Sequence, residues 1–524
     1  MRKIPPALLP LLFSLLILLG FYIGTYSSRG TSYSSNRIQK LDYLLQRVDE
    51  LHLNPTGVDS LLEQAISELL HQLDPHSAYL NAEEVQRSRE SVSGSFVGIG
   101  VEFNVLDDTV WVRSIIEGGP ASKAGLRGGD ALIAANGETL GTLENNEIIK
   151  RLKGQIGTEV PVDVYRPASS TIMPFTIIRG EVPIPSVDVS FHPNENTLFL
   201  RISRFSEPTF KEVQNALKKH KAENLSGIIL DLRDNPGGLL HQAVDVASLF
   251  LAKDDSIVYV EDNRGKATWY INKKQGAYQR QSLVVLINEG SASASEILAG
   301  AIQDNDRGVI IGRRSFGKGL VQEEISLPDG SKVRLTTSRY FTPSGRVIQK
   351  PYDKGFEAYK NEIFDRIHGD DQQTIETPVY RTRNGRIVYG GGGVRPDIQQ
   401  DRDSLSFAAH AFHLLGTIEA LKSIQHFAAI HFDSIANYSP EMVWRSNDKE
   451  LVLRLFPQAE YIPEEDVAQM GKYIKQQILS TVFGRRMMLP FVLRDDPFLQ
   501  KSLRIMEHQE SFDKLLSGNA IINQ

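Results

Sequence analysis

Hydrophobic residues change their spacing several times along the chain, and each change predicts a different kind of structure. An uncharged apolar run, ALLPLLFSLLILLGFYIG, follows two basic residues, Arg2 and Lys3. A run of this length can span a bilayer, and basic residues ahead of it favour an orientation that sends the rest of the chain out of the cytoplasm. No A-x-A cleavage site follows it. The sequence therefore predicts an uncleaved signal-anchor over residues 1–26, with a cleaved signal peptide as the alternative.

Helical spacing follows, and strand-like spacing replaces it further on. Between residues 37 and 92 apolar residues recur three or four positions apart, as on one face of a helix. Over residues 93–180, short runs such as VGIGVEF, TVWVRSII and VPVDVYR alternate with Gly and Asp, which indicates a small β-rich domain.

Apolar strands then alternate with helices over residues 181–403. GIILDLR and SLVVLINEG are apolar throughout, and each precedes an amphipathic helical pattern. Strands of this kind, separated by helices, indicate a sheet that is covered on both faces. Helical patterns fill residues 404–524, where no chemical motif is visible. The fold class predicted is multidomain α/β.

Length, net charge and the absence of cysteine exclude several classes of function but do not identify one. The chain of 524 residues is long enough for several domains, and its formal net charge of −6 gives no sign of a basic face for nucleic acid. It contains no cysteine, which excludes disulfides, thiol nucleophiles and cysteine-based metal sites. No metal or cofactor is expected.

The segment GSASASEI, residues 290–297, contains the first candidate for catalysis. It lies between an apolar strand and a helix, so its serines would stand at a helix N-terminus, where free N–H groups can face an oxyanion. Ser293 and Glu296 also fit the S-x-x-E capping box, which is a purely structural interpretation. The spacing does not choose among Ser291, Ser293 and Ser295.

A serine nucleophile needs a base, and both histidine and lysine are candidates. His241 and His192 have no evident orienting Asp, and the serine run lacks the G-x-S-x-G elbow. Lys318 lies between two glycines and close to Phe316 and Leu320. Apolar neighbours can desolvate its ammonium group and lower its pKa, which would make a neutral amine available as a base. The structural alternative is a solvated surface lysine.

Two further features could complete such a site. Gln322 is four residues after Lys318, and even spacing in a strand would place both side chains on one face, where the amide could orient the amine. The NPGG segment, residues 235–238, closes the strand pattern GIILDLR. Its glycines let backbone N–H groups point into a site, as half of an oxyanion hole. The structural alternative for this segment is a strand-ending turn.

The β-rich region carries a binding motif of its own. SFVGIGVEF resembles the loop with which PDZ domains bind the carboxylate of a peptide C-terminus, while the peptide pairs with the adjacent strand. The later segment GGPASKAGLRGGDALIAANGETL resembles the remainder of a PDZ domain. Residues 93–180 are therefore expected to form a PDZ domain.

Taken in order, these motifs resemble the C-terminal processing peptidases of family S41, also called tail-specific proteases. The resemblance covers about residues 40–400 and includes LDPHSAYL, ILDLRDNPGGLL, GSASASEILAGAIQD, RSFGKGLVQ, SRYFTPSGRVIQ and GVRPDI. It implies a ClpP/crotonase-like α/β core over residues 181–403. It also implies that Ser293 is the nucleophile, Lys318 the general base and Gln322 the residue that orients the lysine.

Two sets of backbone N–H groups complete the site that the resemblance implies. The oxyanion hole would be formed by Gly238 and Ala294. The carboxylate-binding loop of the PDZ domain would be formed by Gly98, Ile99, Gly100 and Val101. The turn NPGG departs from the NGGG-like turn of the family, and Pro236 removes one N–H, although not that of Gly238.

The resemblance predicts a serine endopeptidase that binds accessible, apolar C-termini of polypeptides and cuts them with a Ser–Lys dyad. It implies a location in the bacterial periplasm or cell envelope, with the N-terminal helix in the membrane. The helical regions at both ends could form an interface between copies of the chain, giving a homo-oligomer. Two other functions stay open: a PDZ scaffold with an inactive protease domain, and a Ser–Lys amidase for small amides.

Overall fold

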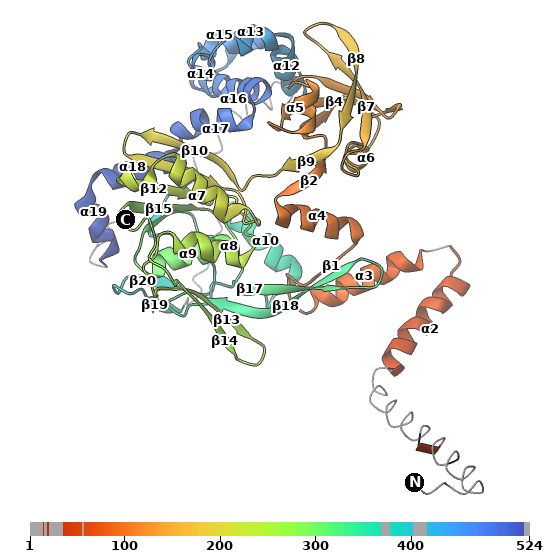
Figure 1. The fold of residues 1–524 in the computed structure, drawn as a ribbon, viewed down its shortest axis with the longest axis vertical. Coiled ribbons are helices and arrows are strands. Elements are labelled where there is room, and N and C mark those ends of the chain that lie inside the picture. Colours follow the sequence, from red (N-terminus) through yellow and green to blue (C-terminus); the bar gives the residue numbers. More distant parts are fainter. Residues whose placement is uncertain are drawn as a thin grey trace, which may run out of the picture. The chain divides into compact units, whose positions relative to one another are not determined.

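The computed structural model describes residues 14, 18–19, 35–54, 57–367, 378–401 and 417–517. The chain forms two compact units, Met1–Tyr79 and Leu80–Gln524, and each is described by itself (Figure 1).

The prediction of an N-terminal membrane anchor is contradicted. In the part of the chain that the structure describes, no helix is both long enough and apolar enough to cross a bilayer. Apart from residues 14, 18 and 19, the predicted segment 1–26 lies outside the described residues. The predicted location in the bacterial periplasm or cell envelope is not shown either.

From residue 35 on, the described part of the first unit forms helices, as the spacing over residues 37–92 predicted. These are α2 (Ser35–Leu51) and α3 (Val58–His71), and β1 (Ala78–Leu80) begins at the end of the unit. Between α3 and β1, the Asp74 carboxylate accepts hydrogen bonds from the main-chain N–H groups of His76 and Ser77. This side chain fixes the turn within the LDPHSAYL motif.

The second unit begins with a helix that leads into a small β-rich domain. Its main sheet has the strand order β3-β4-β5-β7-β8, with β6 paired to β5, and β2 and β9 form a separate pair. The strand β3 is at one edge, and no described strand pairs with its free side. Alternate residues of β4 and β7 point into an apolar core that α5 and α6 complete. The elements are α4 (Ala82–Ser93), β2 (Ser95–Gly98), β3 (Val101–Leu106), β4 (Thr109–Ile115), α5 (Pro120–Ala124), β5 (Ala131–Ala135), β6 (Glu138–Thr139), α6 (Asn145–Leu152), β7 (Glu159–Arg166), β8 (Thr171–Ile178) and β9 (Gly180–Pro183).

A six-stranded sheet forms the centre of the following region. Its order is β10-β11-β12-β15-β16-β21, and all neighbours are parallel except β10 and β11. The strands are β10 (Val187–Asn194), β11 (Thr197–Ile202), β12 (Gly227–Asp231), β15 (Ser282–Ile287), β16 (Val309–Gly312) and β21 (Ile398–Gln399). β12, β15 and β16 are buried along their whole length, as the continuous apolar runs predicted.

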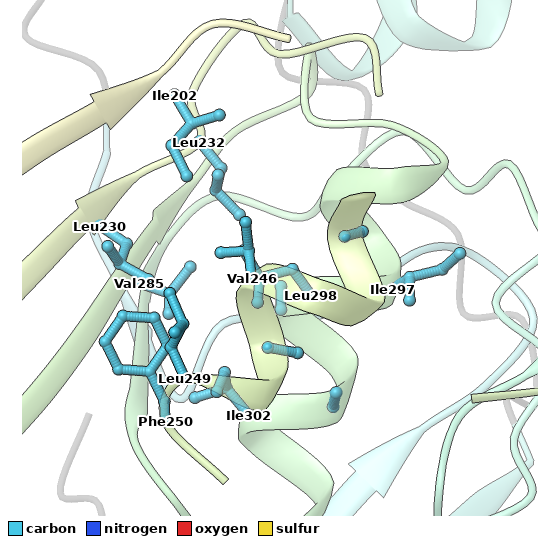
Figure 2. Packing of buried hydrophobic residues seen from close by; sticks show 14 of the residues in the cluster. Ile202, Leu230, Leu232, Val246, Leu249, Phe250, Val285, Ile297, Leu298 and Ile302 are labelled. Atoms are coloured by element: carbon cyan, nitrogen blue, oxygen red, sulfur yellow. The ribbon is translucent and has the colours of Figure 1, made fainter. Parts of the chain in front are cut away.

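Helices cover both faces of this sheet. One face packs on α7 (Thr209–Lys219), α8 (Leu240–Ser248) and α9 (Ala294–Asp304), with the short 3-10 helix η3 (Ala222–Asn224) after α7. Figure 2 shows part of this layer, in which the labelled side chains packed together include Leu230, Val246, Val285, Leu298 and Ile302. Every residue of α9 is buried, so this helix is central to the core.

A second, antiparallel sheet packs on the outer side of α8 and α9. β17 pairs with β18, β18 with β13, and β13 with β14. Smaller elements follow it in the chain. The elements are β13 (Ser256–Asp262), β14 (Ala267–Ile271), β17 (Leu320–Ser326), β18 (Lys332–Phe341), α10 (Phe356–Ile367), β19 (Val379–Arg381) and β20 (Ile387–Tyr389).

The C-terminal extension is helical from residue 417 to residue 516, as predicted for residues 404–524. Its last three helices cover the other face of the six-stranded sheet, where Leu493, Leu499 and Phe512 join Phe199 and Ile229 in one apolar cluster. The remaining helices form a bundle with its own core. The elements are α12 (Thr417–Ile430), α13 (Phe432–Ala436), α14 (Pro440–Trp444), α15 (Asp448–Leu455), η4 (Pro457–Tyr461), α16 (Glu464–Phe483), α17 (Arg485–Arg494), α18 (Pro497–Glu507) and α19 (Gln509–Leu516).

Candidate active site

Three loops that follow neighbouring parallel strands build the candidate active site. β12, β15 and β16 are adjacent in the sheet, and residues 235–238, 290–293 and 313–319 follow their carboxyl ends. Loops at the carboxyl ends of neighbouring parallel strands meet at one edge of the sheet, which is where α/β proteins bind ligands. The sheet thus brings together the NPGG turn, the serine run and the loop that carries Lys318.

The NPGG turn lies directly against Ser293. The main-chain carbonyl of Asn235 accepts hydrogen bonds from Ala292 N and from Ser295 Oγ, both at 3.0 Å. Gly237 has a φ of +96°, and a Cβ atom there would lie 2.8 Å from the Cβ of Ser293 and 2.6 Å from the carbonyl oxygen of Ala292. Only glycine permits this backbone conformation together with so close an approach.

The structure distinguishes the three serines that the spacing left equivalent. Ser291 and Ser295 are completely buried, and each hydroxyl is a donor to a main-chain carbonyl, that of Leu232 and that of Asn235 respectively. Ser293 is only half-buried. It is also the N-cap of α9, with φ +55° and ψ −113°, a conformation that non-glycine residues rarely adopt. Strained residues of this kind are concentrated at functional sites.

Glu296 connects the serine run to the lysine loop. Its carboxylate accepts hydrogen bonds from Ser293 N at 2.8 Å, Gly317 N at 2.7 Å and Lys318 N at 2.9 Å, and from Ser315 Oγ at 2.5 Å. Burial raises the pKa of this carboxyl group to about 7, although the hydrogen bonds oppose the shift. The S-x-x-E spacing indicated only the local contact to Ser293, because the contacts to Ser315, Gly317 and Lys318, 19 to 22 residues away, leave no mark in the sequence.

Tyr340 connects the same two segments from β18. Its hydroxyl donates to the main-chain carbonyl of Ser293 at 3.2 Å and makes a shorter contact with the carbonyl of Lys318. The side chain is almost fully buried, and burial raises its pKa well above the ordinary value for tyrosine. Tyr340 belongs to the motif SRYFTPSG, but sequence reasoning gave it no role.

Further contacts support the lysine loop from behind. Gly319 N donates to Gln349 Oε1 at 2.8 Å, and Lys350 N donates to the carbonyl of Gly317 at 2.9 Å. The guanidinium group of Arg366, from α10, donates to the carbonyl of Ser315 at 2.9 Å. The backbone around half-buried Lys318 is therefore held on several sides.

Gln322 lies in β17, opposite Thr336 of β18. An irregularity of register separates it from Val321, and Lys318 precedes the strand, so simple alternation along a strand does not relate the two side chains. The Nε2 atom of Gln322 is buried and has no hydrogen-bond partner within the part of the chain that the structure describes. The role of Gln322 in orienting Lys318 stays a prediction.

Two backbone amides have the freedom that an oxyanion hole requires. Among the hydrogen bonds of the described residues, none has Gly238 N or Ala294 N as its donor. Ala294 is the first residue of α9, where the helix dipole favours negative charge. The predicted assignment of these two amides to an oxyanion hole is compatible with these contacts and is not tested by them.

The histidines that could have formed a Ser–His–Asp triad have other neighbours. His241 lies 3.6 Å from the carboxylate of Glu207. His192 contacts His220 at 3.0 Å and the carbonyl of Thr197 at 3.2 Å. Within the described residues, no group of three or more acidic or histidine side chains could hold a metal ion.

The predicted carboxylate-binding loop lies between β2 and β3. Gly98 ends β2 and Val101 begins β3, the edge strand. The carbonyls of Ile99 and Gly100 accept hydrogen bonds from Ala121 and Ile116, whereas none of the described hydrogen bonds has Ile99 N or Gly100 N as its donor. A loop with free amides beside an unpaired strand edge has the features that a peptide C-terminus needs for binding by strand addition.

Comparison with known proteins identifies the family. A model of peptidase family S41 matches residues 196–357, and a PDZ domain model matches residues 97–171. The chain is 37% identical to a carboxy-terminal-processing protease of Bartonella bacilliformis over 311 residues. This alignment covers 58% of this chain and 71% of that protein. The chain is also 33% identical to the carboxy-terminal processing protease CtpA of Bacillus subtilis over 323 residues. This alignment covers 62% of this chain and 69% of that protein.

Two solved structures are also similar to parts of the chain. The photosystem II D1 C-terminal processing protease is 29% identical, with a TM-score of 0.36, over 68% of this chain and 86% of that one. The PDZ domain of the carboxy-terminal protease from Vibrio cholerae, in complex with peptide, is 28% identical, with a TM-score of 0.16, over 17% of this chain and 97% of that one. The family match and the identity to relatives show that the chain belongs to peptidase family S41 and is a serine protease that carries a PDZ domain.

Proposed function

We propose that this protein is a C-terminal processing endopeptidase in which Ser293 is the nucleophile and Lys318 the general base. The proposal rests on two side chains, Glu296 and Tyr340, each of which contacts both the segment of Ser293 and the segment of Lys318. Glu296 accepts the main-chain N–H groups of both Ser293 and Lys318, and the Tyr340 hydroxyl contacts the main-chain carbonyls of both. These contacts keep a strained, half-buried serine and a lysine in one site.

The chemistry is acyl transfer. The neutral amine of Lys318 accepts the proton of the Ser293 hydroxyl as the oxygen attacks the scissile carbonyl. The N–H groups of Gly238 and Ala294 stabilise the oxyanion, and removal of one such donor typically costs about 2.7–4 kcal/mol of transition-state stabilisation. The ammonium group of Lys318 then protonates the leaving amine. Water then attacks the ester carbonyl of the acyl-enzyme while Lys318 accepts its proton. The ester bond breaks, and the ammonium group returns the proton to the Ser293 oxygen, which restores the free enzyme and releases a carboxylic acid.

Gln322 is the residue that orients the lysine in this proposal. An unpaired buried amide donor is costly, and it is rare in a residue without a function. The amide oxygen of Gln322 can accept an N–H of the neutral Lys318 amine, which leaves the single lone pair of that nitrogen free for the proton of Ser293. The unpaired Nε2 atom of Gln322 supports this assignment.

The PDZ domain determines which end of the substrate is bound. The free amides of Ile99 and Gly100, together with those of Gly98 and Val101, would bind the terminal carboxylate of a polypeptide with an apolar C-terminus. The adjoining residues would pair with the free edge of β3. Capture of one end raises the effective concentration of the neighbouring peptide bonds at the dyad.

The experiment is hydrolysis of an unfolded polypeptide with an apolar C-terminus, followed by mass spectrometry of the products. Ser293→Ala and Lys318→Ala should each reduce hydrolysis to background, because each removes a group that reacts. Ser326→Ala and Lys354→Ala, which alter exposed residues of the same types, should retain activity. Substantial activity in Lys318→Ala would contradict the lysine base.

The C-terminal preference has its own control. The same substrate with an amidated C-terminus lacks the carboxylate and should be cut more slowly. Equal rates for both substrates would contradict binding of the terminus by the PDZ loop, and they would leave the dyad assignment intact.

A further inference from the structure

The helices after residue 417 lie outside the regions matched by the S41 and PDZ families, and they contact both domains. α16 packs on β4 of the PDZ domain, whereas α17, α18 and α19 pack on strands of the peptidase core. Figure 1 shows the helices α12 to α16 beside the PDZ domain and α17 to α19 along the six-stranded sheet. The C-terminal extension therefore connects two domains that perform different steps.

The contact with the PDZ domain is close and is built around residues 127–129. A Cβ atom on Gly128 would lie 1.9 Å from the carbonyl oxygen of Thr481 in α16, and one on Gly129 would lie 2.6 Å from the Cβ of Ala429 in α12. Backbone approach at these distances is possible only where glycine occurs. The surfaces are therefore fitted to one another at this point.

Charged side chains surround this contact. Arg127 donates to Asp433 at 2.7 Å, and its guanidinium group lies over the ring of Phe432. Lys422 of α12 forms an ion pair with Asp107, which follows β3. Opposite charges placed on both sides of a contact fix its register, even where each exposed pair contributes little free energy.

The other end of the extension is fixed to the core next to the catalytic turn. Asp496, at the start of α18, accepts a hydrogen bond from Arg233 at 2.8 Å. Arg233 also pairs with Asp231, the last residue of β12, and lies over the ring of Phe498. Arg233 is two residues before Asn235, the first residue of the NPGG turn.

The connections between the PDZ domain and the core in the chain itself are narrow. β2 and β9 form a two-stranded pair through which the chain enters and leaves the domain, and Ile184 N donates to the carbonyl of Gly94 beside it. Two ion pairs link α4 to the PDZ domain: Glu83 pairs with Lys150 of α6, and Glu90 pairs with Lys153, the residue after α6. A two-stranded connection alone permits rotation, so the extension adds the second attachment that a fixed orientation requires.

We propose that the C-terminal helices fix the PDZ domain against the peptidase core and thereby set the number of residues between a captured C-terminus and the bond that is cut. This inference rests on the proposed function, because it assumes capture by the PDZ domain and hydrolysis at the dyad. An extended chain advances about 3.3 Å per residue, so a displacement of the PDZ domain by that amount moves the cut by one residue. A fixed attachment gives one principal cut, whereas a loose one gives several.

The test uses the full chain, the same unfolded substrate and mass spectrometry of the released C-terminal fragments. Gly128→Ala introduces a methyl group against Thr481, and Arg127→Glu places two negative charges together at Asp433. Both should turn one principal fragment into a series that differs by single residues. The double variant Arg127→Glu/Asp433→Arg restores opposite charges and should restore the principal fragment. Lys123→Glu makes the same change of charge at an exposed residue and should leave the fragments unchanged.

Amide hydrogen exchange of residues 106–113 and 127–130, measured on the same variants, reports the contact itself. Faster exchange with an unchanged fragment pattern would overturn the proposal, as would a wild-type protein that releases many fragments of unrelated length. Unchanged exchange in both Gly128→Ala and Arg127→Glu would also overturn it, because these contacts would then not hold the domain. A wild-type protein without any hydrolysis would instead contradict the proposed function.

Discussion

Replacement of Tyr340 by Phe tests whether the segments that carry Ser293 and Lys318, the proposed nucleophile and base, need a shared hydrogen-bond donor. The ring is almost fully buried in the core beside α9, and Phe preserves its shape, so the substitution removes one hydroxyl and little packing. The carbonyl of Ser293 keeps the N–H groups of Glu296 and Ile297 as donors, at 2.8 and 3.0 Å. The loss therefore falls mainly on the lysine loop.

Tyr340→Phe should lower both the folding stability and the rate of catalysis. Loss of a donor to buried carbonyl groups costs about 1–3 kcal/mol of folding free energy. For catalysis, a shift of a reacting group by about 1 Å can cost about 100-fold, so we expect kcat to fall about 10- to 100-fold. This corresponds to about 1.4–2.7 kcal/mol in the activation barrier. KM should change less than kcat, because Tyr340 contacts the segments that carry the proposed nucleophile and base.

The assay measures kcat and KM on the unfolded substrate together with the urea midpoint of unfolding. Tyr259→Phe is the control, because Tyr259 lies in β13 of the same sheet and stacks on Phe341 and Trp269. It should reduce stability slightly and leave kcat unchanged. A Tyr340→Phe enzyme that is less stable but has the wild-type kcat would refute the idea that this hydroxyl positions the dyad. An equal loss of kcat in both variants would refute it as well.

Two further predictions concern the same site. The pKa of Glu296 is raised from 4.5 to about 7, so the folded state binds this proton more tightly than the unfolded state. The free energy of unfolding should therefore fall as pH rises between these values, by on the order of 3 kcal/mol. Urea unfolding at pH 5 and pH 8 should show this decrease in the wild type and not in Glu296→Gln. Gly237→Ala should abolish hydrolysis and lower the free energy of unfolding by several kcal/mol, because its Cβ would meet Ala292 and Ser293. Backbone strain accounts for about 1–3 kcal/mol of this loss. The hydrolysis assay checks the first effect, and unfolding followed by circular dichroism checks the second.

The proximity of the NPGG turn and the serine run could be predicted because both follow apolar strand patterns of the kind that form one parallel sheet. The continuous apolar runs predicted buried parallel strands, and the segments at their carboxyl ends then had to meet at one edge of the sheet. The structure places NPGG and the serine run side by side, as the hydrogen bonds of Asn235 show. It also shows that capping and catalysis are compatible interpretations of Ser293, because the Glu296 contact to Ser293 N is present at a residue that is strained and half-buried.

The remainder depended on contacts between distant residues, which spacing does not reveal. The shift of register beside Gln322 arises in the pairing with β18, so simple alternation could not place that side chain relative to Lys318. The helical pattern of the C-terminal extension was visible, but the surface it covers was not. In the sequence, Leu499 and Phe512 look like ordinary apolar positions of an amphipathic helix. Only the structure shows that they pack with Ile229 on one face of the six-stranded sheet.

The burial of Glu296 bears on whether Lys318 can act as the base that we propose. An ionised carboxylate close to a lysine favours the ammonium form, which cannot accept a proton from serine. Glu296 is bound to the main-chain N–H of Lys318 and is fully buried, and its pKa is raised to about 7. Near neutral pH a substantial fraction of this group is therefore uncharged. The same carboxyl group can thus hold the backbone of the serine and the lysine together while it opposes the neutral amine less than an exposed, fully ionised glutamate would.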